Sequence, residues 1–240
     1  MDVWLSEVEL DVLWESVDLG EPPLVLDVPS PGATHAERAH IVRRTWDGLA
    51  ERGVPTAVVQ DQLRTPATGR RSFELRAWLD GEVRVLLSAD GDSAVLAVLA
   101  QGGCTLRSLP STDLAGRIVS VLPDVPAGRG VSVNVPVASF AAAGQKHRGS
   151  DIAEALARDG LSLSDARVLV SMCEGITRRG QFAATWRTSQ GSRERAGHVV
   201  GFHENASGRY LALRRGDYLT VAPVDATRLS GELTGLFAGV

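Results

Sequence analysis

The hydrophobic and polar positions of the chain follow one order twice. Residues 95–122 and residues 210–237 each contain a short apolar strand, a glycine turn, a second strand that ends before a proline, and an amphipathic helix. In both helices the apolar positions recur at i, i+4, i+7 and i+8, which places them on one face. These positions are Leu114, Ile118, Val121 and Leu122 in the first copy and Leu229, Leu233, Leu236 and Phe237 in the second. The pattern predicts a repeated unit of strands and helix.

Capping signals place the remaining helices. Ser6 and Thr34 each stand three residues before a glutamate, so each predicts a capping box at a helix start. Gly20 and Gly53 are expected to end these two helices. Apolar spacing predicts further helices over 150–158 and 164–173, and Asp225 is expected to cap the last one. The proline-rich stretch at 22–33 is expected to be extended and to end in a turn.

Alternating positions predict two antiparallel meanders. Residues 73–79 alternate between apolar and polar side chains, and Asp80-Gly81 is a hairpin turn signal. Further strands are expected over 83–88, 94–99 and 105–109, over 131–135, and over 181–188, 196–203, 209–213 and 218–221. The predicted fold is therefore α+β, a quasi-twofold repeat of an antiparallel meander plus helix, with a central sheet flanked by helical groups.

Composition narrows the class of protein. The chain has 240 residues, 44% of them hydrophobic and 22% charged, which is typical of a globular protein. Its net charge of −4 gives no support for nucleic acid binding. The acidic start lacks the basic and apolar regions of a secretion signal, and no apolar stretch approaches the roughly 18 residues of a membrane span. We expect a cytoplasmic protein without membrane insertion.

No constellation of residues predicts catalysis, a metal or a cofactor. Cys104 and Cys173 are isolated thiols, which favours small buried hydrophobic side chains. None of the patterns GxxxxGK[ST], GxSxG and HExxH occurs, and Gly128-Arg129-Gly130 lacks the third glycine of a dinucleotide loop. His35 and His40 are five apart on a predicted helix, and His198 and His203 five apart on a predicted strand, so neither pair shares a face.

Other polar and aromatic residues allow two interpretations. Trp78 follows the polar face of its strand; either a helix buries it, the commoner case, or it is an exposed partner anchor. The pair His203-Glu204 is either half of an acid–base site or, as we favour, a solvated strand end. Trp186 is expected in the core. The pairs Arg70-Arg71, Arg178-Arg179 and Arg214-Arg215 are expected to be solubilising charge at strand ends, and residues 144–149 to be a linker or mobile loop.

Several segments, in order, resemble one family. The opening resembles EspG-type proteins, the chaperones of the actinobacterial type VII (ESX) secretion system, in its Leu10-x-x-Leu13-Trp14 helix, its stretch from Pro22 to Pro31 and its second capped helix. Later segments resemble that family's strands: Arg179-Gly180-Gln181-Phe182-Ala183-Ala184, Gly208-Arg209-Tyr210-Leu211 and Thr220-Val221-Ala222-Pro223. The similarity spans essentially the whole chain, which implies a single EspG-like domain over 1–240 with repeat halves of about 1–125 and 126–240.

The resemblance implies binding without catalysis. EspG-type proteins cap the exposed tip of a secreted helical heterodimer of the PE–PPE type in the cytosol, which keeps it soluble for export. By resemblance, the partner is a PE–PPE-like or WXG-type protein. The family interface lies on the sheet and the C-terminal helical region. There we expect the partner-binding residues to be outward-facing strand residues, namely Arg76, Trp78, Gln181, His198 and Val200.

Two rival hypotheses come from other classes of protein. One is a small-molecule-binding or enzymatic α/β protein with a pocket between the two halves, which a deep cavity lined by His or carboxylates would favour. The other is a structural homodimer that uses the same surface on itself. The sequence leaves both open.

Overall fold

The computed structural model describes residues 2–238, which fold into helices and antiparallel strands. The chain divides into two compact units. The first contains residues 1–76, 81–114 and 185–195, and the second contains residues 77–80, 115–184 and 196–240. The boundary therefore crosses the chain several times, so each unit is assembled from segments that are distant in sequence.

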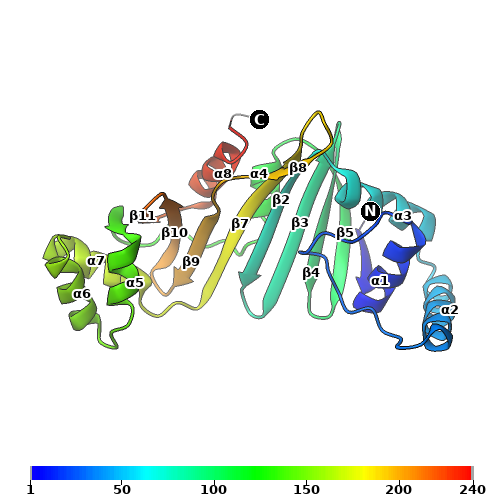
Figure 1. The fold of residues 1–240 in the computed structure, drawn as a ribbon, viewed down its shortest axis with the longest axis horizontal. Helices are drawn as coiled ribbons and strands as arrows, with labels where there is room; N and C mark the ends of the chain where they lie inside the picture. The colour runs from blue at the N-terminus through cyan, green and yellow to red at the C-terminus, as the bar shows by residue number, and fades with distance from the viewer. Residues whose placement is uncertain (1, 239–240) are drawn as a thin grey trace. The chain divides into compact units, whose positions relative to one another are not determined.

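The first unit contains the predicted meander and one additional strand. Its strands are ordered β1-β5-β4-β3-β2 (Figure 1). Their bounds are β1 Asp2–Ser6, β2 Arg71–Trp78, β3 Glu82–Asp90, β4 Ser93–Ala100 and β5 Gly103–Pro110. The last two residues of β2 belong to the second unit. Strand β1 was not predicted from the sequence, because only Val3 and Leu5 point inward and the segment is too short to show a period.

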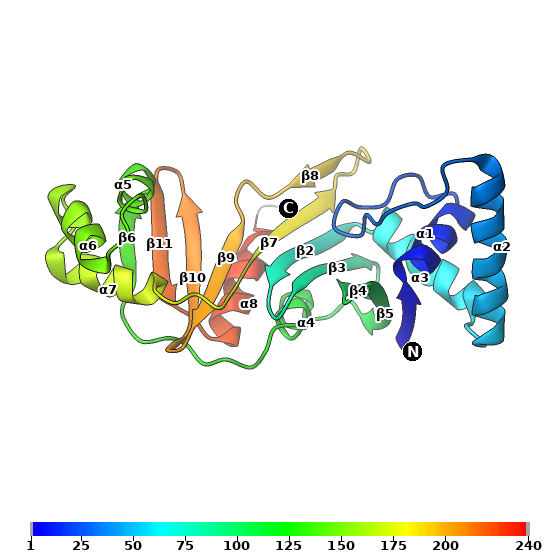
Figure 2. The same cartoon turned by 90° about the horizontal axis from the view of Figure 1, so that it is seen from below.

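Three helices cover one face of these strands. Helix α1 (Glu7–Ser16) and helix α3 (Thr56–Thr68) pack against the sheet, and α2 (His35–Glu51) lies outside them against α1 (Figure 2). Both predicted capping boxes are present, at Ser6 and at Thr34. Helix α3 was not predicted. Its buried residues, including Val59 and Leu63, lie at helical spacing, but Pro66 in its last turns obscures the pattern.

The second unit contains the second meander. Its strands are ordered β7-β9-β10-β11-β6. Their bounds are β6 Val133–Pro136, β7 Arg178–Arg187, β9 Val200–Asn205, β10 Gly208–Arg215 and β11 Tyr218–Pro223. The end of β7, from Thr185, belongs to the first unit and pairs there with the short strand β8, Arg193–Arg195. All the strand pairs of both units are antiparallel, so the predicted α+β class is confirmed.

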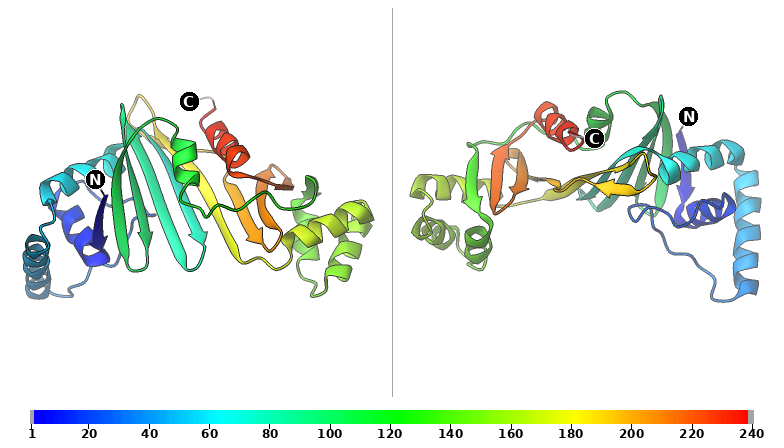
Figure 3. Two further views of the ribbon diagram at one scale, coloured as in Figure 1. Left: turned by 180° about the vertical axis from the view of Figure 1, so that it is seen from behind. Right: turned by 45° about the horizontal axis from the view of Figure 1, so that its top comes forward.

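Helices lie on both faces of the second-unit strands. Helices α5 (Val137–Ala143), α6 (Gly149–Arg158) and α7 (Leu163–Cys173) share a core with one face, which includes Val135, Tyr210 and Val221. Helix α8 (Ala226–Gly235) begins at the predicted cap Asp225 and lies over these strands in Figure 3. We call the face that meets α5–α7 the helical face. Among residues 2–238, no helix combines the length and the apolarity that a membrane span requires.

Several predicted elements differ in extent from the structure, among them the first helix, which ends at Ser16 rather than at Gly20. The helix expected over 111–122 is α4, which covers only Leu114–Val119, because turns surround it on both sides. The strand expected to start at residue 196 starts at Val200, because the segment that follows β8, which includes Gly197, is not part of a strand. Ile118 and Leu233 are equivalent positions of the predicted repeat, and both side chains are fully buried. The two copies therefore agree in packing at this position.

Replacing either repeat position with alanine is expected to destabilise the fold. Ile118→Ala and Leu233→Ala each remove buried methyl groups and leave a cavity, so each should lower the free energy of unfolding by about 2–5 kcal/mol. Chemical denaturation measures the change. Leu24→Ala is the control: its side chain is 77% exposed, and its loss should stay below about 0.5 kcal/mol. Unchanged unfolding midpoints for both repeat variants would show that the repeated helices are not packing units.

Candidate functional site

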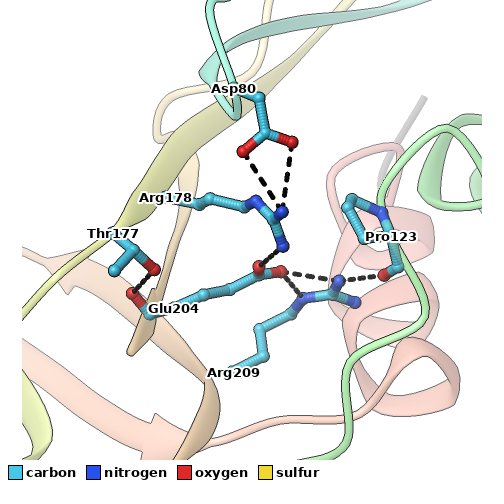
Figure 4. A network of polar contacts seen from close by, with 6 residues as sticks. All are labelled: Asp80, Pro123, Thr177, Arg178, Glu204 and Arg209. Carbon is cyan, nitrogen blue, oxygen red and sulfur yellow. Dashed lines mark hydrogen bonds and ion pairs between the residues drawn. The ribbon is translucent and has the colours of Figure 1, made fainter. Parts of the chain in front are cut away.

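A buried ion pair lies at the centre of the second unit. Arg209 on β10 and Glu204 on β9 face each other in the strand register, and their side chains are only 1% and 2% exposed. Arg209 Nε donates to Glu204 Oε1 over 2.7 Å (Figure 4). Its guanidinium also donates to the carbonyl oxygen of Pro123 and lies over the ring of Phe202. A buried charge requires such partners, because burial removes its hydration.

Two further residues extend the pair to the protein surface. Arg178 on β7 lies opposite Glu204, and its Nη1 is 3.6 Å from Glu204 Oε2. Its Nη2 donates to both carboxylate oxygens of Asp80, over 3.1 and 3.2 Å, and these contacts raise the pKa of Arg178. Thr177 completes the cluster by donating its side-chain hydroxyl to Glu204 O over 3.3 Å (Figure 4), and its backbone N–H donates to the same oxygen. The network thus links β7, β9 and β10 to the turn at residues 77–80.

The glycine-rich segment at 126–130 packs against β10. Gly128 N donates to Arg209 O, and Tyr210 Oη donates to Arg129 O over 3.1 Å. A Cβ at Gly128 would lie 2.1 Å from the Tyr210 ring, so only glycine fits at this approach. Gly128-Arg129-Gly130 therefore allows the close approach of this segment to β10.

A buried histidine joins the sheet to the end of α7. His203 Nε2 lies 2.9 Å from Met172 O, and its ring stacks on Tyr210 with a centroid separation of 5.3 Å. The amide of Asn205 donates to the carbonyls of Met172 and Glu174, which satisfies the helix end. Desolvation lowers the pKa of His203 below its usual value, although the Met172 carbonyl opposes this by favouring the protonated ring. His203 therefore positions α7 in its neutral form.

An apolar groove opens among α5, α6 and α7. Its volume is about 270 Å³, and it is lined by Phe140, Gly144, His147, Gly149, Ile152, Leu156, Leu169, Val170, Cys173 and Glu174. The predicted loop segment 144–149 forms one of its borders. Burial raises the pKa of the Cys173 thiol to about 11, so the thiol stays protonated near neutral pH. The groove is thus lined mostly by apolar side chains, and the thiol in it is not a thiolate near neutral pH.

The second cysteine is similarly inert. Cys104 lies fully buried in the first-unit core, and desolvation raises the pKa of its thiol to about 12. Cys104 was expected to act as a buried apolar side chain and does so, whereas Cys173 is half-buried. Within residues 2–238, no cluster of three or more His, Cys, Asp or Glu side chains is arranged to hold a metal ion.

Four of the five predicted partner-binding residues are at least partly accessible, namely Arg76, Trp78, Gln181 and His198. Trp78 is 57% exposed at the end of β2, so the burial that we considered the commoner case is wrong for this residue. Gln181 on β7 is exposed and pairs with Gly201. Alternation along β7 places Gln181 on the same face as Arg179, whose strand partner is His203 on the helical face. His198 is half-buried and precedes β9 rather than lying in it.

The other two predicted residues, Val200 and Arg76, are engaged within the protein itself. Val200 is fully buried on β9 beside Phe182, so the expectation that it faces outward is wrong. The expectation failed because both faces of β9 are covered, as the burial of the adjacent residues Phe202 and His203 shows. Arg76 is exposed but donates to Leu24 O over 3.0 Å, which ties the proline-rich segment to β2. Arg76 belongs to the first unit, whereas the other four residues belong to the second.

Some polar residues are more buried than the sequence indicated. His203 and Glu204 were interpreted as a solvated strand end, and both are buried. Arg178 was interpreted as solubilising charge and is instead part of the ion-pair network. The predicted position of His203 and Glu204 at a strand end suggested solvent, but only the tertiary packing shows that β9 and β10 are covered. Trp186 is half-buried rather than in the core, and its indole donates to Glu194.

Comparisons with known proteins agree on one family. The model of the EspG family matches residues 6–235. The fold is similar to a solved structure of the Mycobacterium tuberculosis type VII secretion system chaperone EspG5, determined in complex with a PE25–PPE41 dimer. That match has a TM-score of 0.77 and 16% sequence identity, and it covers 100% of this chain and 97% of the other. A comparison with curated proteins gave no match.

Breaking the buried ion pair is expected to destabilise the fold strongly. Arg209→Met leaves the Glu204 carboxylate buried with only Arg178 nearby, which should lower the free energy of unfolding by about 3–5 kcal/mol. Asp80→Asn is the control, because Asp80 is 83% exposed and solvent screens its ion pair with Arg178, so its loss should have a much smaller effect. The double variant Glu204→Met/Arg209→Met should recover most of the loss. Equal stabilities of Arg209→Met and Asp80→Asn in urea unfolding would refute the role of the pair.

Acidification is expected to destabilise the protein through His203. Because the pKa of His203 is lower in the folded state, the unfolded chain binds more protons below the unfolded pKa of about 6.5. Stability should therefore fall as the pH falls below 6.5, by at most about 1.4 kcal/mol per pH unit from this group. In His203→Gln, whose amide can still donate to Met172 O, this component should vanish. Identical pH profiles for the two proteins between pH 7.5 and 5 would contradict the assignment.

Proposed function

The chain belongs to the EspG family, and we propose that it is a substrate chaperone of a type VII secretion system. In this proposal it binds a helical heterodimer of the PE–PPE type, or a WXG-type relative, and keeps the pair soluble until export. The observation that carries the proposal is the match of the fold, over nearly the full length of both chains, to a chaperone solved with such a dimer. We further propose that the two compact units act together as one EspG-like domain.

The apolar groove among α5–α7 suits such a partner. The tip of a helical pair presents apolar side chains that associate with one another unless they are covered. A shallow groove lined by Phe140, Ile152 and Val170 offers them a matching surface, and the adjacent Gly144–Gly149 segment can adjust its backbone on binding. The rim residues His147 and Glu174 supply polar contacts at the edge of the same site.

Exposed residues outside the groove extend the proposed surface. Trp78 is a large, exposed aromatic side chain, the type that most often dominates binding energy at protein interfaces. Gln181 and His198 remain proposed partner contacts, since both are at least partly accessible. Arg76 belongs to the first unit and is proposed only as a separate contact, since Leu24 O already engages its guanidinium. Val200 is withdrawn, because a fully buried side chain cannot touch a partner without unfolding.

The proposed role requires no catalysis. Both thiols are held protonated by burial, and the buried His203 is occupied by the end of α7. A reversible cap for nascent secretion substrates acts before export, so we propose a cytoplasmic protein that is not an enzyme. The binding energy then comes from covering apolar surface, and release is left to the export machinery.

The proposal predicts that blocking the groove abolishes partner capture. Gly144 has a helical backbone, and a side chain there would make only ordinary contacts with its own turn, so Gly144→Trp should fold and fill the groove. Trp78→Ala should weaken capture by about 2 kcal/mol or more, roughly thirtyfold in the dissociation constant. The measurement is co-expression with the PE–PPE-type pair encoded nearest to this chain, followed by affinity capture and titration.

Matched control variants distinguish an effect on the proposed surface from a general effect of the added or removed side chain. Gly231→Trp places the same bulk on the open surface of α8, and Trp4→Ala removes an exposed tryptophan of the first unit. Both controls should bind as the wild type does. If folded Gly144→Trp and Trp78→Ala also bind normally, the proposed surface is wrong although the chaperone function stands. If the wild-type chain captures no such pair, the function itself is refuted.

A further inference from the structure

The first unit contains a second hollow, far along the chain from the groove. It lies between α1 and the proline-rich segment 20–31, which we call the arch, and its volume is about 420 Å³. Leu10, Trp14, Leu26 and Val28 give it an apolar floor, and the first three of these are almost fully buried. A hollow of this size accommodates one or two amino-acid side chains.

Hydrogen bonds from three directions hold the arch open. Trp14 Nε1 donates to Gly20 O over 2.7 Å, and the positive φ of Gly20, +76°, lets the chain turn there. On the other side, Arg76 donates to Leu24 O and Arg84 Nη1 donates to Asp27 O over 2.6 Å. The hollow is therefore preformed, because the arch cannot collapse onto Trp14 without losing these bonds.

The rim of the hollow is acidic. Four carboxylates line it, those of Asp11, Glu15, Glu21 and Asp27, against the single guanidinium of Arg38. Arg38 forms ion pairs with both Asp11 and Glu15, so its charge is already balanced. Within residues 2–238, the side chains of Glu21 and Asp27 have no hydrogen-bond or ion-pair partner. Among the lining side chains the carboxylates are in excess, while Arg76 and Arg84 are engaged by backbone carbonyls of the arch. An apolar floor with such an acidic rim is complementary to an apolar group flanked by cations.

We propose that this hollow is a docking site for an extended, cationic peptide segment, with a bulky aliphatic side chain on the Leu10–Trp14 floor and Lys or Arg residues beside Glu21 and Asp27. The apolar floor makes burial of the aliphatic side chain favourable, whereas the two unpaired carboxylates select for positive charge and disfavour acidic segments. The proposal is independent of the chaperone function, because the hollow lies wholly within the first unit and shares no residue with the α5–α7 groove.

The test is a titration of the isotope-labelled full chain with three probe peptides, followed by amide chemical shifts. The probes are acetyl-Arg-Leu-Arg-amide, acetyl-Arg-Ser-Arg-amide and acetyl-Glu-Leu-Glu-amide. Only the first should shift the resonances of α1 and of residues 20–30 in a saturable way. Added salt should weaken its binding, because the rim carboxylates are exposed. Saturable shifts with the Ser or Glu probe of equal affinity would overturn the proposal, as would their absence with all three probes.

A pair of charge-matched variants assigns the binding to the rim. Glu21→Gln/Asp27→Asn removes two negative charges from the hollow, and it should weaken the first probe by about three- to tenfold. Asp61→Asn/Asp92→Asn removes the same charge from exposed positions of the same unit that do not line the hollow, and it should leave the affinity unchanged. If both double variants lose affinity equally, the attraction is to the net charge of the protein and the docking site is refuted.

Discussion

A buried ion pair, in which both charges require partners, determines how several segments of the second unit are placed. Glu204 and Arg209 face each other across β9 and β10 and are almost inaccessible to water. Because neither ion can be left unpaired, Arg209 also binds the carbonyl of Pro123, and Glu204 is approached by Arg178. The segment at 123–130, the start of β7 and the turn at 77–80 are thereby fixed to the same two strands. An apolar pair of similar volume could fill this space, but it would not specify these three attachments.

The two units contain hollows of different character, one among helices and one between a helix and a proline-rich segment. The groove among α5–α7 is lined mostly by apolar side chains from three short helices, with a glycine-bounded loop at its edge. The hollow beneath the arch has a smaller apolar floor and a carboxylate rim, and hydrogen bonds fix its walls. Apolar surface of the first kind suits a partner that must be shielded from self-association. The second kind selects by charge, which allows discrimination between segments of similar hydrophobicity.

Family membership is carried by pattern more than by residue identity. At 16% identity to the EspG5 chain, the fold is retained over the whole length. In this chain the fold rests on physical features: capped helices at Ser6 and Thr34, strands that alternate, and a glycine where the backbone approaches a ring, as at Gly128 against Tyr210. Such features tolerate many substitutions, since a core requires size and polarity at each position rather than one side chain. Surface residues have no such constraint, so partner specificity can diverge on a constant scaffold.

The sequence by itself determined the α+β class, both meanders, the two capping boxes and the burial of Ile118 and Leu233, because these depend on local period and on nearby residues. It also indicated the family. Only the tertiary structure decided which polar residues are buried: Glu204 and His203 look like a solvated strand end until α7 and the 123–130 segment cover them. It likewise exposed Trp78, buried Val200 and engaged Arg76 with the arch. Whether a strand residue is buried depends on the segments that pack against the strand. Those segments lie tens of residues away in the chain, so a local sequence pattern cannot predict the burial.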